Sequence, residues 1–145
     1  MAGVVALSLL TLVTSAQAKL LSVKVRSANF RDGPSMTAEI LFTADRYFPV
    51  RVLKHKRGWV EVEDFERERA WVAARLLGRL DTAIVKVQVG NVRAGPSIHH
   101  GVVGKIHYGE AFRIKKRKGR WLKLASSDAI IGWVRDDLTW GDERS

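Results

Sequence analysis

"NFRDGPS", residues 29–35, and "NVRAGPS", residues 91–97, are almost the same string, and they lie 62 residues apart. At this offset residues 24–77 align without a gap, and 14 of the 54 positions are identical. The identities include two pairs of tryptophans, Trp59 with Trp121 and Trp71 with Trp133. Self-similarity at one fixed period indicates a duplicated structural unit, so the sequence predicts two tandem repeats of about 60 residues.

Hydrophobic residues inside each repeat recur with a period of two, which is typical of half-buried β-strands. Buried positions are expected at Val50, Val52, Val60 and Val62, and at Phe112, Ile114, Leu122 and Leu124. The residues between them are Arg51, Trp59 and Glu61, and Arg113, Lys115, Trp121 and Lys123. Short strands separated by Gly, Pro and charged loops predict a small all-β barrel or sandwich for each repeat.

One segment, residues 63–80, has the composition of a helix. Its counterpart, residues 125–142, contains poor helix formers and a glycine, and aligned segments should fold alike. We therefore expect a turn, a short Trp-Val strand and one 3₁₀ turn, which ends at Leu76 in the first repeat and at Leu138 in the second.

Three landmarks follow one another in each repeat at the same spacing. They are the Asn-x-Arg-x-Gly-Pro-Ser string, the Trp strands at 58–62 and 120–124, and the closing segments at 70–76 and 132–138. In this the chain resembles bacterial SH3 domains. The resemblance implies a five-stranded, partly open β-barrel in each repeat, and an interaction or targeting module of the cell envelope that often binds peptidoglycan. The pattern has glycine where this chain has Ala70 and Arg120, so we expect these two turns to be distorted.

The first eighteen residues carry no charge and contain an apolar run from Val4 to Val13, followed by Ala16-Gln17-Ala18. The run is too short to span a bilayer comfortably, and the Ala-x-Ala pattern matches a signal peptidase site. We expect a signal peptide at 1–18 that is cleaved after Ala18, and a periplasmic or secreted bacterial protein. The expected domains are 19–79 and 80–141, followed by a tail at 142–145.

The composition limits the function classes. The net charge is +10, which favours an anionic partner such as an envelope polymer, a membrane surface or nucleic acid. Cysteine is absent, which excludes disulfides, thiolate–zinc sites and a cysteine nucleophile. We found no motif of an enzyme or of a cofactor site, and the histidines at 99, 100 and 107 do not recur in the first repeat. We therefore expect a non-enzymatic protein without a cofactor or metal.

The candidate binding site combines two features, an outward-facing tryptophan and a basic loop, in each repeat. Trp59 and Trp121 should point away from the core, because they alternate with buried residues. Each follows a basic loop, and the candidate ligand-binding residues are these two tryptophans with Lys54, Lys56, Arg57, Lys115, Lys116, Arg117, Lys118 and Arg120. The Gly-Pro-Ser turns, with Arg31 and Arg93, are expected to be structural, and Trp71 and Trp133 to be packing residues.

The expected partner is peptidoglycan or another anionic envelope polymer, captured by the basic loops and then bound on the tryptophans. One alternative is an adaptor that binds an envelope protein or wall enzyme, in which case binding should survive high salt. The less favoured alternative is nucleic-acid binding in the cytoplasm, since basic β-barrels also serve this role.

Overall fold

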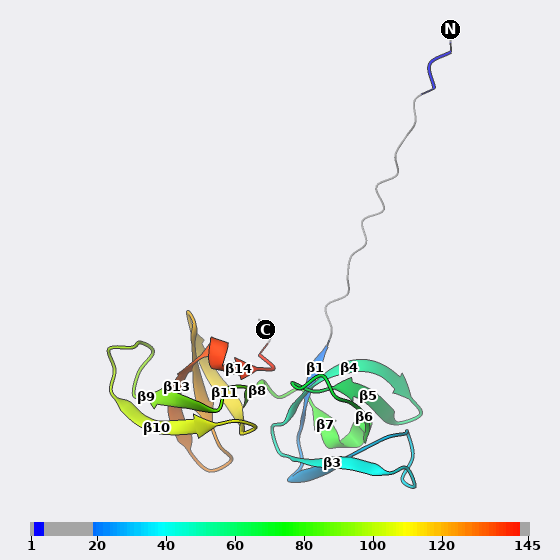
Figure 1. Ribbon diagram of the computed structural model, residues 1–145, viewed down its shortest axis with the longest axis horizontal. Coiled ribbons are helices and arrows are strands. Elements are labelled where there is room, and N and C mark those ends of the chain that lie inside the picture. The colour runs from blue at the N-terminus through cyan, green and yellow to red at the C-terminus, as the bar shows by residue number, and fades with distance from the viewer. Residues whose placement is uncertain (1, 5–18, 143–145) are drawn as a thin grey trace.

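The computed structural model describes residues 2–4 and 19–142. The predicted signal peptide at 1–18 therefore lies almost wholly outside the described residues, as does most of the predicted tail. In the described part of the chain there are two antiparallel sheets of seven strands, two 3₁₀ turns and no α-helix. The all-β prediction and the division into two barrels are confirmed (Figure 1).

The two sheets have the same strand order. The first has the order β3-β2-β6-β5-β4-β1-β7 and the second has the order β10-β9-β13-β12-β11-β8-β14. The first sheet consists of β1 (Leu20–Val23), β2 (Ser27–Arg31), β3 (Ile40–Asp45), β4 (Pro49–Lys56), β5 (Trp59–Glu63), β6 (Arg69–Ala73) and β7 (Leu77–Gly78). The second consists of β8 (Thr82–Val85), β9 (Val89–Arg93), β10 (Val102–His107), β11 (Ala111–Lys118), β12 (Trp121–Ala125), β13 (Ile130–Arg135) and β14 (Thr139–Trp140).

Seven paired segments replace the expected five because the Gly-Pro-Ser turn does not lead into an irregular loop. In the first repeat it connects β2 to β3, and the two strands form a hairpin in which Ala28 lies opposite Ala44. The second repeat repeats this hairpin with β9 and β10. The segment after the turn is thus largely a strand, and β3 and β10 each form one edge of their sheet.

The predicted alternation places the cores correctly. Val60, Val62, Leu122 and Leu124 are almost completely buried, and the tryptophans that precede them are half-buried. The first core also contains an aromatic cluster, in which the rings of Phe30 and Phe42 stack with centroids 4.8 Å apart. In the second core Val92 occupies the position of Phe30.

The segment with helical composition forms a strand and a 3₁₀ turn, as its alignment with the second repeat predicts. β6 ends at Ala73 and is followed by the 3₁₀ turn η1 (Ala74–Leu76), while β13 is followed by η2 (Asp136–Leu138). Asp64 closes the preceding turn, since its Oδ1 accepts hydrogen bonds from the backbone N–H groups of Glu66 and Glu68, each at 2.9 Å. Burial raises the pKa of the Asp64 carboxyl above its ordinary value of 3.8.

The two repeats differ in backbone conformation at the two positions where the family pattern has glycine. At the β5 hairpin the turn residues Arg57 and Gly58 both have positive φ, whereas the second repeat has glycine one residue earlier, so that Gly119 takes the positive φ and Arg120 does not. Gly132 has φ +130°, and a Cβ there would lie 2.7 Å from a Val92 methyl. Ala70, at the equivalent place, has no positive φ. Each departure from the family pattern is thus accommodated by a local difference in backbone conformation.

The two repeats lie side by side (Figure 1). All four residues of β8 are buried, although a strand with one covered face would bury only every second one. Ala83 and Val85 belong to the second core, while Ile84 points the other way and β8 contacts β4 of the first repeat. β8 is therefore covered on both faces.

Two aromatic contacts connect the repeats elsewhere. The rings of Phe65 and Tyr108 have centroids 5.3 Å apart, and the Arg51 guanidinium lies 5.4 Å from the centroid of the Trp140 ring. In addition, the Ser22 hydroxyl donates a hydrogen bond to the Leu80 carbonyl at 3.3 Å. In the part of the chain that the structure describes, no helix is long and apolar enough to cross a membrane.

Candidate functional site

The arginine before each Gly-Pro-Ser turn holds the turn together. Arg31 Nη1 donates hydrogen bonds to the carbonyls of Met36 and Ala38, both at 2.9 Å, and its side chain is 9% exposed. Arg93 repeats this arrangement with Ile98 and His100 at 3.2 and 2.9 Å. The structural role predicted for these arginines is confirmed, because each pins the β-hairpin loop from within.

Trp59 and Trp121 begin β5 and β12 and lie on the outer face of their sheets, as the alternation predicts. Each is paired across the strands with a lysine, Lys56 or Lys118. On its other side Trp59 faces Ala73, whereas Trp121 faces Arg135. The two tryptophans are therefore equivalent in the fold but have different neighbours, and only Trp121 is flanked by cations on both sides.

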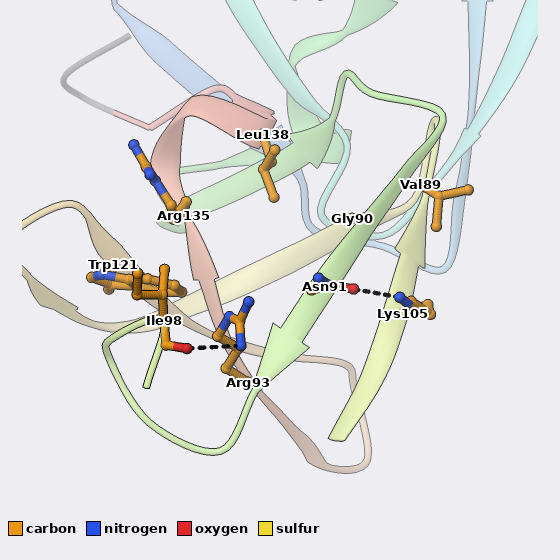
Figure 2. A pocket seen from close by; sticks show the side chains of 9 residues that line it. All are labelled: Val89, Gly90, Asn91, Arg93, Ile98, Lys105, Trp121, Arg135 and Leu138. Atoms are coloured by element: carbon orange, nitrogen blue, oxygen red, sulfur yellow. Dashed lines mark hydrogen bonds between the residues drawn. The ribbon is translucent and has the colours of Figure 1, made fainter. Parts of the chain in front are cut away.

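A shallow pocket of about 300 Å³ lies beside Trp121 (Figure 2). It is formed where β9, the loop after it, β10, β12 and the end of β13 meet, and its lining residues are Val89, Gly90, Asn91, Arg93, Ile98, Lys105, Trp121, Arg135 and Leu138. The Lys105 ammonium donates a hydrogen bond to Asn91, and the Arg93 guanidinium is held against the Ile98 carbonyl. The pocket thus combines an indole face with three positively charged side chains.

Sequence reasoning identified Trp121 but not the rest of this pocket. Lys105 and Arg135 were not among the candidates, because Thr43 and Ala73 occupy their places in the first repeat. Ile98 likewise stands where the first repeat has Met36. A signal was present in the differences between the repeats, since Arg135 replaces Ala73 on β13, directly beside Trp121, and Lys105 replaces Thr43 on β10.

The basic loop of the first repeat is partly neutralised. Lys54 lies on β4, where its Nζ is 3.3 Å from Glu61 Oε2 and 5.5 Å from the Trp71 ring centroid. Lys56 and Arg57 are exposed at the end of the hairpin. On the same sheet Arg51 forms an ion pair with Glu63 at 3.2 Å. Two glutamates of β5 therefore pair with two of the three Lys or Arg residues of β4.

The basic loop of the second repeat separates into paired and unpaired cations. The Arg117 guanidinium donates to both carboxylate oxygens of Asp81, and its Nε lies 3.6 Å from Asp142. Arg120 donates a hydrogen bond to Asp136 at 2.9 Å, which raises the pKa of its guanidinium. Lys115, Lys116, Lys118 and Arg120 are exposed, and among the described residues the three lysines form no ion pair. Arg117 thus connects segments within the protein, and we take the lysines as the surface that is open to a ligand.

The remaining candidates concern packing and metals. Trp133 is 8% exposed, which confirms its packing role, while Trp71 is half-buried. His100 lies 2.9 Å from the Ser97 hydroxyl and His107 lies 3.1 Å from Glu110. Among the residues that the structure describes, no three His, Cys, Asp or Glu side chains are grouped so that they could hold a metal ion.

Comparison with curated proteins finds a relative in Bacillus subtilis. It is named "Putative N-acetylmuramoyl-L-alanine amidase YrvJ" and is 24% identical over 136 residues, which cover 86% of this chain. The chain spans only about a quarter of that relative, 26% of its length.

Comparison with solved structures finds similar chains at low sequence identity. An NlpC/P60 family protein from Bacillus cereus is 12% identical, with 84% of this chain and 56% of that one covered and a TM-score of 0.40. NlpC2 from Trichomonas vaginalis is 14% identical, with 87% and 49% covered and a TM-score of 0.37. The structure titled "Endolysin LysPBC5 CBD" is 15% identical, with 87% and 95% covered and a TM-score of 0.36.

Two sequence profiles, each described as a bacterial SH3 domain, match the chain in tandem. The first matches residues 24–78 and the second matches residues 88–139. These ranges coincide with the two sheets and with the two halves of the 62-residue duplication. The chain therefore belongs to the bacterial SH3 domain family and contains two such domains in succession.

Proposed function

We propose that this chain is an exported, non-enzymatic binding module of the bacterial cell envelope, and that it binds peptidoglycan or another anionic envelope component. The observation that carries this proposal is the Trp121 pocket, which joins an aromatic face to Arg93, Lys105 and Arg135 on a bacterial SH3 barrel. The relative named as an N-acetylmuramoyl-L-alanine amidase supports a cell-wall setting.

The proposed mechanism has two steps. The cations of the hairpins, chiefly the exposed lysines beside Trp121, first attract an anionic ligand and raise its local concentration. The ligand then lies against the indole of Trp121, where apolar contact adds to charge-assisted hydrogen bonds from the pocket. Carboxylates of the murein stem peptides carry the negative charge that this site would attract. Trp59 is expected to contribute less, because Ala73 replaces the flanking arginine.

Co-sedimentation with purified murein sacculi at moderate salt tests this function. The parent protein should pellet with the sacculi. Trp121→Ala should lower the bound fraction strongly and Trp59→Ala weakly, while both variants keep the thermal unfolding transition of a folded barrel. A double variant that pellets as well as the parent would contradict the mechanism. Binding that persists at high salt and is insensitive to both changes would favour a protein-interaction adaptor instead.

The proposed export has its own test. The signal peptide prediction implies that the protein recovered from its native host begins at Lys19. N-terminal sequencing of the protein from the envelope or secreted fraction should therefore yield Lys19-Leu20-Leu21. A protein that retains Met1 and is found only in the cytoplasm would overturn the proposed location, and the basic charge would then have to serve a cytoplasmic partner.

A further inference from the structure

Two lysines lie directly opposite each other on the outer face of the second repeat. In the register of β11 with β12, Lys116 is the partner of Lys123. Like charges directly opposite across two strands are destabilising. The first repeat has the same two positions occupied by Lys54 and Glu61, which form an ion pair at 3.3 Å. The second repeat therefore carries a repulsive pair at a place where its own fold accommodates an attractive one.

The difference extends over the whole three-stranded face. The strands β4, β5 and β6 carry four Lys or Arg residues and two Glu, whereas β11, β12 and β13 carry seven Lys or Arg residues and no carboxylate. Lys123 stands at the place of Glu61, Lys115 at that of Leu53, and Ala125 at that of Glu63. We call the surface formed by Arg113, Lys115, Lys116, Lys118 and Lys123 the lysine face.

The cations of the lysine face form a row along β11. Arg113 precedes a β-bulge at Lys115, after which Lys116 and Lys118 share the outer side with Trp121 and Lys123. Alternate residues of a strand lie about 7 Å apart, so the row is on the order of 15 Å long. Lys123 extends it sideways, with its Nζ 6.0 Å from the Trp133 ring centroid.

No carboxylate of the described residues neutralises this row. None of the five side chains of the lysine face forms an ion pair within residues 2–4 and 19–142, and most described carboxylates of the second repeat have other partners. Those partners are Arg117 for Asp81 and Asp142, Arg120 for Asp136, Arg135 for Asp137 and His107 for Glu110. Within the part of the chain that the structure describes, no carboxylate offsets this repulsion, which is expected when a ligand supplies the negative charge.

We propose that the lysine face of the second repeat binds a linear polymer that carries a phosphate group on each unit. A row of cations along one strand suits a chain that carries many negative charges, whereas a single small anion would engage only one or two of them. Lysine binds phosphate oxygens as a compact point charge, and no bidentate arginine fork is required. This inference deepens the proposed function, because it assigns the phosphate chemistry to one face of one repeat, apart from the Trp121 pocket.

Binding of fluorescently labelled inorganic polyphosphate, measured by anisotropy over a series of salt concentrations, tests the inference. With about four contacts, the slope of log K against log salt concentration should be about −3. Lys123→Glu should reduce the slope by about one contact and weaken binding at least about tenfold. The matched control is Lys86→Glu, which makes the same change of charge at an exposed residue outside β11, β12 and β13, and it should stay within about twofold of the parent.

A reciprocal variant adds a gain-of-function arm. Glu61→Lys recreates the lysine pair on the first repeat and should raise the affinity for polyphosphate. The inference is overturned if polyphosphate does not bind, if Lys86→Glu weakens binding as much as Lys123→Glu does, or if the protein binds only vesicles that contain anionic lipids. Murein sedimentation of the parent protein separates the two proposals. Murein binding without polyphosphate binding means that this inference fails, and polyphosphate binding without murein binding means that the murein proposal fails.

Discussion

Replacing Lys123 with glutamate is expected to stabilise the second repeat, although Lys123 is the native residue. The ion pair of the first repeat shows the geometry available, with Lys54 Nζ 3.3 Å from Glu61 Oε2. Two unit charges at this separation attract by about 1.3 kcal/mol in water. The Lys54 side chain is 63% exposed, so solvent screening and lost side-chain entropy reduce this to about 0.2–1 kcal/mol.

Removing the repulsion with Lys116 adds a similar amount. The expected gain is therefore about 0.5–1.5 kcal/mol, which corresponds to a rise in Tm of about 2–6 °C for a chain of this size. Thermal unfolding followed by circular dichroism at low and at high salt measures it. Because salt screens both the attraction and the repulsion, the difference from the parent should shrink as salt is added.

Two control variants test whether the change in stability comes from the interaction between residues 116 and 123. Lys123→Gln removes the repulsion without adding an ion pair, so its Tm should lie between those of the parent and Lys123→Glu. Glu61→Lys in the first repeat should lose about the same free energy of unfolding that Lys123→Glu gains. If Lys123→Glu is no more stable than Lys123→Gln at low salt, the two side chains do not interact across β11 and β12, and the reasoning from the register fails.

Three further changes test the structural account, each by chemical or thermal unfolding. Gly132→Ala should lower the free energy of unfolding of the second repeat by about 2–4 kcal/mol, because the backbone of Gly132 has φ +130° and a Cβ there would overlap its neighbours. Ala70→Gly, at the equivalent place in the first repeat, should lower it by only about 1 kcal/mol. Equal losses would contradict this. Arg31→Met should lose about 2 kcal/mol or more and Arg93→Met less, since the former is the more buried donor; the opposite order would contradict it. The Tm of Asp64→Asn should rise relative to that of the parent as the pH increases from about 4 to 7. The raised pKa of Asp64 means that the folded state favours the protonated carboxyl, so the parent loses stability as Asp64 ionises. A Tm difference that stays constant across this range would contradict this.

The repeated string and the period of two were sufficient to predict the fold. The offset of 62 residues aligned a segment of helical composition with one that could not be helical, and η1 and η2 occupy the places predicted for the 3₁₀ turns. The strand β3 was missed because its apolar residues do not follow the burial pattern: Ile40 and Leu41 are 47% and 48% exposed. An edge strand lacks a neighbour on one side, so its alternation is a weak signal.

The candidate site was predicted only in part. Period two placed Trp121 on the outer face, but the pocket beside it depends on β9, β10 and β13, whose side chains meet only in the folded sheet. The run of cations after Ile114 also did not reveal which of them is paired. Arg117 finds its carboxylate at Asp81, which is 36 residues away in the chain, and no local pattern indicates this.

The first and last strands of each barrel are neighbours. β1 pairs with β7, and β8 pairs with β14, so that the chain enters and leaves each repeat at the same corner of the sheet. Only three residues, 79–81, connect the end of β7 to the start of β8. A unit with this geometry can be multiplied by simple duplication of its coding sequence, because a further copy needs no long crossover and leaves the existing cores intact. Once two copies exist, each is free to accumulate its own surface charges, as the contrast between Glu61 and Lys123 illustrates.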